Sequence, residues 1–73
     1  MKIIFDMVLR PGEQPKHSSR FDIDRKEQPE VFDGKGEPYV APPFDLSTFK
    51  PSFYIPKPFA QNAKRIRVTL EEL

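Results

Sequence analysis

Six of the nine prolines in this 73-residue chain lie within residues 38–60, PYVAPPFDLSTFKPSFYIPKPFA. Proline fixes φ near about −65° and disfavours helical geometry at the residue before it. A continuous helix or a central strand is therefore excluded here by five of these residues, Pro42, Pro43, Pro51, Pro56 and Pro58. We expect the segment to run extended and irregular, as an arm.

The same segment holds six of the nine aromatic residues, whereas a solvating linker is poor in aromatics and rich in charge. Each aromatic side chain removes about 150 to 250 Å² from water when it is buried. A soluble monomer does not leave the apolar surface of six aromatic side chains exposed, so either the protein itself or a partner must cover them. We favour a partner, and expect its contacts to be Tyr39, Phe44, Phe49, Phe53, Tyr54 and Phe59, with the charges of Lys50 and Lys57 at the rim.

Two segments that precede the arm have strand patterns. Residues 2–9, KIIFDMVL, are rich in strand-forming side chains and end at a turn signal, Pro11-Gly12. Residues 18–26, SSRFDIDRK, alternate apolar and charged side chains, which is typical of a strand with one face in water. We expect the two strands to pair antiparallel.

The rest of the chain is less regular. In residues 29–40, Asp33-Gly34-Lys35-Gly36 predicts a turn within a loose hairpin or loop. The tail, residues 61–73, fits both a helical and a strand period, and its β-branched Ile66, Val68 and Thr69 favour a strand beside the N-terminal one.

The predicted fold is therefore mainly β with much irregular structure. A small sheet of two or three antiparallel strands is formed by a segment at residues 1–37 and a C-terminal strand within 61–73. The arm, residues 38–60, extends from it, and all three parts make one small unit.

A chain of this length buries only about 60% of the surface that it exposes when unfolded, so its stability is marginal. Disulfides and a structural metal are the usual reinforcements, but there is no cysteine and a single histidine, His17. A partner subunit is the remaining one. We expect no cofactor, metal or small-molecule substrate.

No apolar run exceeds three residues, far short of the roughly 18 that a membrane span needs, and Asp6 and Arg10 interrupt the N-terminal run. We expect a soluble protein with no signal peptide and no membrane contact. The sequence does not identify its location, and a virus particle and the cytoplasm are the two candidates.

Three groups of polar residues could carry chemistry. Asp22, Asp24 and Glu27 lack the glycine and the terminal glutamate of a calcium loop, and we assign them to the wet face of a strand. His17 has no orienting partner in sequence and is expected to be exposed. A weak nucleic-acid site could use Lys64, Arg65 and Arg67, but the net charge of +1 provides no general attraction for phosphates.

These features predict a non-enzymatic structural or accessory subunit, whose arm docks onto other protein subunits of a larger assembly. Virus and phage particles use short chains in this way, as cement, clamps or minor virion proteins, and are the first context to consider. The alternative is a small regulator or inhibitor that binds a host enzyme or a nucleic-acid groove.

Overall fold

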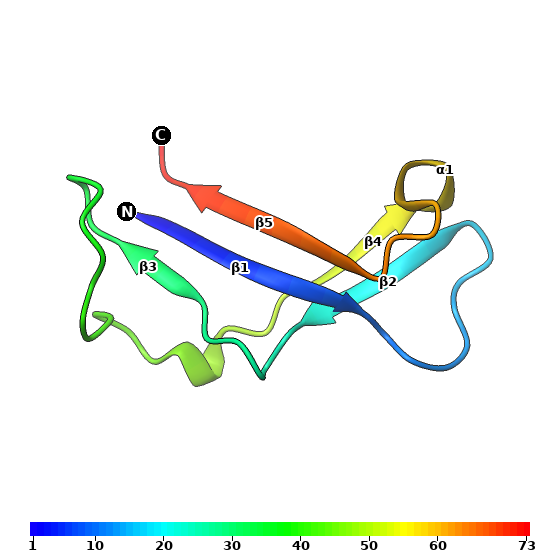
Figure 1. The fold of residues 1–73 in the computed structure, drawn as a ribbon, viewed down its shortest axis with the longest axis horizontal. Helices are drawn as coiled ribbons and strands as arrows, with labels where there is room; N and C mark the ends of the chain where they lie inside the picture. The colour runs from blue at the N-terminus through cyan, green and yellow to red at the C-terminus, as the bar shows by residue number, and fades with distance from the viewer.

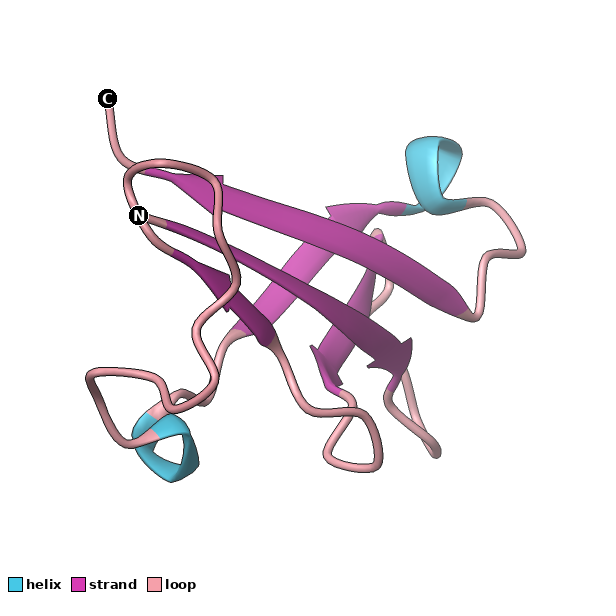
Figure 2. Cartoon of the chain, turned by 60° about the vertical axis from the view of Figure 1, so that its left-hand side comes forward, coloured by secondary structure: helices cyan, strands magenta, loops and turns pink.

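The computed structural model describes residues 1–73 as a single antiparallel sheet with two short helical turns (Figure 1). The strands are β1 (Lys2–Leu9), β2 (Ser18–Ile23), β3 (Glu30–Phe32), β4 (Ser52–Pro56) and β5 (Arg65–Glu71). The helical turns are the 3-10 turn η1 (Leu46–Thr48) and the α-helical turn α1 (Lys57–Ala60). Figure 2 shows a strongly twisted layer, with the two helical turns at opposite ends of the molecule.

β1 is the central strand of the sheet. One of its edges pairs with β5 over seven residues, from Lys2 opposite Glu71 to Val8 opposite Arg65. Its other edge is shared, because β3 pairs with the first half of β1 and β2 pairs with the second half. β4 adds to the outer edge of β2, so the free edges of the sheet include β5 and β4.

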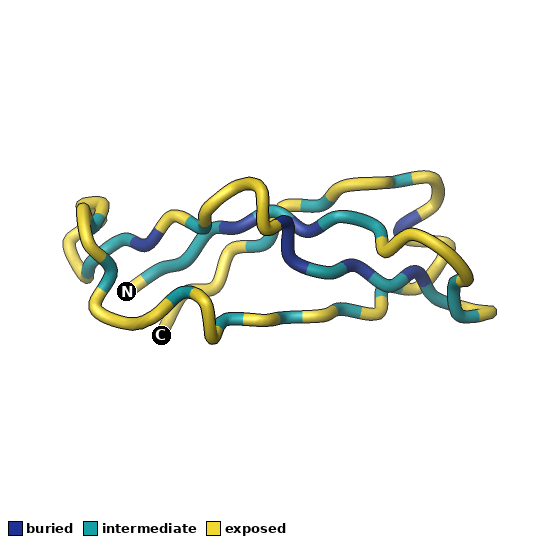
Figure 3. Tube along the Cα trace, turned by 90° about the horizontal axis from the view of Figure 1, so that it is seen from below, coloured by how far each residue is buried: buried dark blue, intermediate teal, exposed yellow.

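The core lies on one face of the sheet, as the strand alternation requires. Phe5 and Met7 of β1 point to the same face as Phe21 and Ile23 of β2, and Ala60 of α1 closes the cluster. Half-buried apolar side chains of β4, β5 and η1's C-cap pack around it, among them Phe49, Phe53, Ile55, Ile66 and Val68. Most of the buried segments belong to β1 and β2, and the loops at the two ends of the molecule are largely exposed (Figure 3).

The molecule is flat and elongated. Its extents are 40 × 23 × 15 Å and its radius of gyration is 13.8 Å, whereas a compact domain of this length has about 11 Å. Only 8 of the 73 residues are buried, so the core is small even for a chain of this size.

The strands predicted at residues 2–9 and in the tail are confirmed, as are the antiparallel pairing and the place of the tail beside β1. The strand predicted at 18–26 is also present, but it ends at Ile23, where the chain enters a turn. The sheet has five strands, however, and the prediction of two or three was too small. The short β3 and the proline-flanked β4 account for the difference.

The arm is not shown as a separate extended segment. Residues 52–56 form β4, and residues 57–60 form α1. Strand β4 tolerates Pro56 because it lies at the sheet edge: Lys57 N–H donates to His17 C=O (3.1 Å), so alternate amides, at Ser52, Tyr54 and position 56, point away from β2. The missing N–H of Pro56 therefore removes no bond within the sheet.

The predicted turn at Asp33–Gly36 is confirmed as part of a loose hairpin, with a single bridge between Phe32 and Pro38. The Asp33 carboxylate accepts the backbone N–H groups of Lys35 (2.8 Å) and Glu37 (2.9 Å). Gly36 has a φ of 82°, a backbone conformation that residues with a Cβ atom rarely adopt.

Phe21→Ala should lower the free energy of unfolding by about 3 to 5 kcal/mol, because it removes a fully buried ring from the small core. The matched substitution Phe59→Ala, at an exposed ring, should change it by no more than about 0.5 kcal/mol. Urea unfolding followed by circular dichroism measures both. Equal effects of the two substitutions would contradict the assignment of the core.

Candidate functional site

The aromatic residues of 38–60 divide into two groups. Phe49 and Phe53 turn inward, and the ring of Phe49 meets Phe5 edge-on, with centroids 5.0 Å apart and planes at 86°. These two predicted partner contacts therefore cover the protein's own core. Phe44, Tyr54 and Phe59 are exposed, and Tyr39 is half-buried, with its N–H donating to Val31 C=O (2.9 Å).

Phe59 is the most exposed aromatic side chain, at 81%, yet its backbone is firmly held. The next residue, Ala60, is 5% exposed and belongs to the core, and Ala63 N–H donates to Ala60 C=O (2.8 Å). Pro56 and Pro58 restrict the backbone on the other side. The fold therefore presents a large apolar side chain to solvent on a rigid support.

Tyr54 is held on the opposite, polar face of β4 at 57% exposure. The Arg20 guanidinium lies over its ring, 5.8 Å from the centroid, and donates from Nε to Asp22 (3.1 Å). Asp22 also accepts from the Ser52 hydroxyl (2.8 Å), and this bond, followed by the one from Arg20, lowers the pKa of the Asp22 carboxyl. The ring thus has a defined place beside a polar network that joins β2 to β4.

The two lysines predicted at the rim, Lys50 and Lys57, are both exposed and form no ion pair. Lys57 begins α1, two residues before Phe59, and Lys50 follows Phe49. Each therefore places a free cation close in sequence to an aromatic residue of the segment.

A second polar cluster lies on β1 and β5 and was not foreseen. Asp6 accepts from Nε of Arg67 (2.8 Å) and from Nη2 of Arg65 (3.0 Å), and Arg65 Nη2 also reaches Asp24 (2.8 Å). The side chains of Asp6 and Asp24 are only 11% and 10% exposed. Asp24 was expected on the wet face of a strand, but its side chain is covered by Arg65.

These bonds favour the charged form of every member. Arg67 lowers the pKa of Asp6, and the Lys26 N–H together with Arg65 lowers that of Asp24, while the carboxylates raise the pKa of both arginines. Arg65 and Arg67 already pair with carboxylates, so less of their charge is available to a phosphate. Of the predicted nucleic-acid residues, only Lys64 is exposed without an ion pair.

The register of β1 with β5 places Asp6 directly opposite Arg67. The signal that could have found this cluster was present in the sequence, because Asp6 interrupts an apolar strand and two arginines alternate in the tail. Opposite charges on facing strands stabilise a register.

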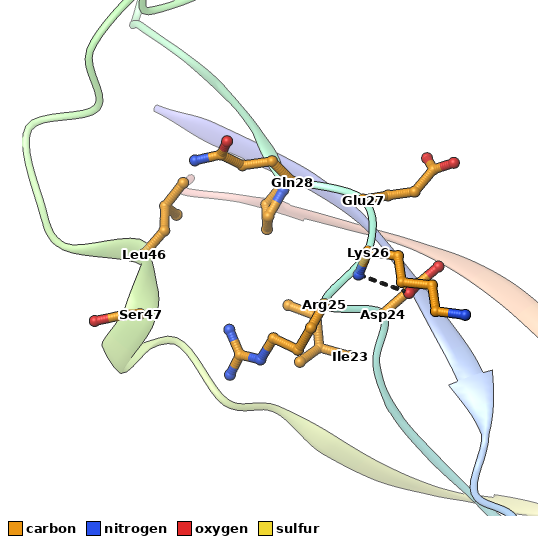
Figure 4. Close-up of a pocket in the computed structure, with 9 residues that line it drawn as sticks. Ile23, Asp24, Arg25, Lys26, Glu27, Gln28, Leu46 and Ser47 are labelled. Atoms are coloured by element: carbon orange, nitrogen blue, oxygen red, sulfur yellow. Dashed lines mark hydrogen bonds between the residues drawn. The ribbon is translucent and has the colours of Figure 1, made fainter.

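A shallow pocket lies between the turn at residues 24–29 and η1 (Figure 4). Arg25 spans it and donates to Phe49 C=O (2.8 Å), while Lys26 and Glu27 point away from Leu46. The Asp24 carboxylate accepts the Lys26 N–H (3.0 Å), which closes the turn. These contacts fix the turn against η1, and no nucleophile and base lie together in the pocket. No group of three side chains in the chain has the arrangement of a metal site.

Comparison of the chain with protein-family models, curated proteins and solved structures gives no match in any of the three. No helix of the fold has the length and apolar character needed to cross a bilayer.

Acidification should destabilise the protein through Asp6 and Asp24. Their pKa values are lower in the folded state, so their contribution is complete above the unfolded value, near 3.8, and is lost as the pH falls through the folded values. Thermal unfolding between pH 7 and pH 2 should show this loss. In Asp6→Asn the loss should be smaller, whereas Glu13→Gln, at an exposed residue without an ion pair, should leave the profile unchanged.

Proposed function

We propose that this chain is a non-enzymatic structural or accessory subunit that binds other subunits of a larger assembly through its proline- and aromatic-rich segment, residues 38–60. The observation that carries the proposal is the presentation of Phe59, a ring that is 81% exposed beside a buried Ala60. An anchor that is already ordered loses little conformational entropy on binding. Aromatic side chains of this kind dominate the energetics of interfaces.

The accessible surface supports the need for a partner. The chain exposes 5676 Å², whereas a compact monomer of 8.5 kDa has about 4,650 Å². The excess, about 1,000 Å², is similar to the area of about 800 Å² that each partner contributes to a standard interface. We take this excess as support for a surface that a partner covers.

The contacts we propose are the exposed members of the segment. Phe59 and Tyr54 would be the main anchors, Phe44 an additional one and Tyr39 a minor one, with Lys50 and Lys57 at the rim. We leave Phe49 and Phe53 out of the proposed anchors because they pack on the protein's own core. The segment thus both completes the small sheet and leaves aromatic side chains for a partner.

Virus and phage particles are the first class of assembly we would examine, since they use short chains as cement or clamps. A small regulator of a host enzyme is the alternative. A subunit is recovered in a particle or a large complex, whereas a regulator is recovered as a free monomer that binds one partner reversibly.

The test is copurification of the tagged chain from its native source. The double variant Tyr54→Ala/Phe59→Ala should reduce recovery of the partner at least about tenfold, since each ring is expected to contribute on the order of 1 to 2 kcal/mol. Leu73→Ala, at a fully exposed apolar residue outside residues 38–60, is the control and should retain the partner. Circular dichroism checks that every variant is folded. Undiminished recovery with the double variant would refute the anchors, and absence of any complex would favour the regulator.

A further inference from the structure

The outer edge of β5 presents backbone groups that the chain itself does not use. Leu9 N–H donates to Lys64 C=O (2.9 Å) and Glu72 N–H donates to Met1 C=O (3.3 Å). These two bonds show which residues of β5 are hydrogen-bonded to β1. The even-numbered residues of β5 therefore bond to β1, and the odd-numbered ones point outward. The outward N–H and C=O groups belong to Arg65, Arg67, Thr69 and Glu71, and no other strand pairs with them.

The two outer strands β4 and β5 differ in how they are protected. β4 has five residues, and the missing N–H of Pro56 lies on its free side. β5 has seven residues and no proline, and it extends along one side of the molecule (Figures 1 and 2). A long regular edge of this kind is a template for pairing with another strand.

We propose that β5 pairs antiparallel with β5 of a second copy of this chain, with Val68 opposite Val68 at the two-fold axis. Val68 is the midpoint of Arg65–Glu71, so this register pairs all seven residues of the strand. It also pairs the outward-pointing residues with one another, and forms about eight backbone hydrogen bonds. The two sheets become one continuous sheet through a symmetric interface.

The side chains of β5 complement themselves in this register. On the polar face Arg65 lies opposite Glu71, so each end of the interface has a pair of opposite charges. Arg65 remains suitable for this contact, because its side chain is 44% exposed and its Nη1 group makes no hydrogen bond. Glu71 forms no ion pair within the chain.

The apolar face of β5 gives a second argument for a copy of the same chain. Leu70 is 43% exposed at the end of an apolar row that begins with the half-buried Ile66. In the proposed register Leu70 lies opposite Ile66 of the second copy, and the two Val68 side chains meet between them. The apolar row thus continues across the interface into the second copy.

Sedimentation velocity over a range of concentrations tests the association. The wild-type chain should shift from 8.5 kDa to twice that mass as the concentration rises. Glu71→Arg places like charges opposite each other at two symmetric positions and should weaken the dimer about tenfold. Glu13→Arg makes the same change of charge in the loop before β2 and should have no effect. A wild-type chain that stays monomeric throughout, or equal dimerisation of both variants, would overturn the proposal.

Thr69→Pro tests the backbone contribution. The N–H of Thr69 points outward, so proline removes no bond to β1 but blocks the partner strand, and the dimer should be lost. Circular dichroism and thermal unfolding check the folding of both this variant and Glu71→Arg, which lies opposite Lys2. A folded Thr69→Pro chain that still dimerises would exclude the β5 edge.

Single cysteines test the register, since the chain has no other thiol. Facing residues at a non-hydrogen-bonded position have Cα atoms about 4.5 Å apart, within the range of a disulfide. With diamide as oxidant, Val68→Cys should cross-link to itself. Ile66→Cys and Leu70→Cys should cross-link to each other in a mixture, but neither should cross-link to itself, although residue 70 is the more exposed. Preferred self-cross-linking of Leu70→Cys would overturn the register.

These outcomes are independent of the proposed docking function. Tyr54 and Phe59 lie on β4 and α1, so a failure of the aromatic anchors leaves the β5 cross-link intact, and a monomeric chain leaves the docking proposal standing.

Discussion

The whole sheet depends on β1, because β2, β3 and β5 all attach to it directly and β4 attaches through β2. Its odd-numbered residues bond to β5 and its even-numbered ones to β2 and β3, so both edges are used. β1 also supplies Phe5 and Met7 to the core. Both lie in the middle of β1, near the point where pairing with β3 ends and pairing with β2 begins. A chain with so few buried residues thus concentrates its stability in one strand, and the surrounding surface remains available for contacts.

The sequence predicted the strands that have a clear pattern. β1, β2 and β5 alternate or are rich in β-branched residues, and pairing between the first strand and the tail followed from these patterns. β4 was missed because its prolines argue against a strand, although Pro51 precedes it and Pro56 ends it at a free edge. Three residues are too few for a pattern to identify β3, which depends on its pairing with β1.

The candidate contacts were only partly predictable. The composition of residues 38–60 indicates that its rings need cover, but which rings face the core depends on the β2–β4 register and on the position of α1. Phe53 packs on the core and its neighbour Tyr54 is exposed, because adjacent residues of a strand point to opposite faces of the sheet. The Asp6 cluster likewise depends on a register between segments about sixty residues apart, which local sequence patterns do not contain.

The pairing of β1 with β5 also determines the order in which the protein can form. β1 is synthesised first and β5 last, and their seven-residue ladder closes a loop that contains every other element. Sheets dominated by such distant pairings fold in milliseconds to seconds, slowly for a chain of this size. During synthesis one edge of the apolar strand β1 remains unpaired until β5 has been made. The nascent chain therefore exposes a strand edge, prone to aggregation, that the folded molecule covers.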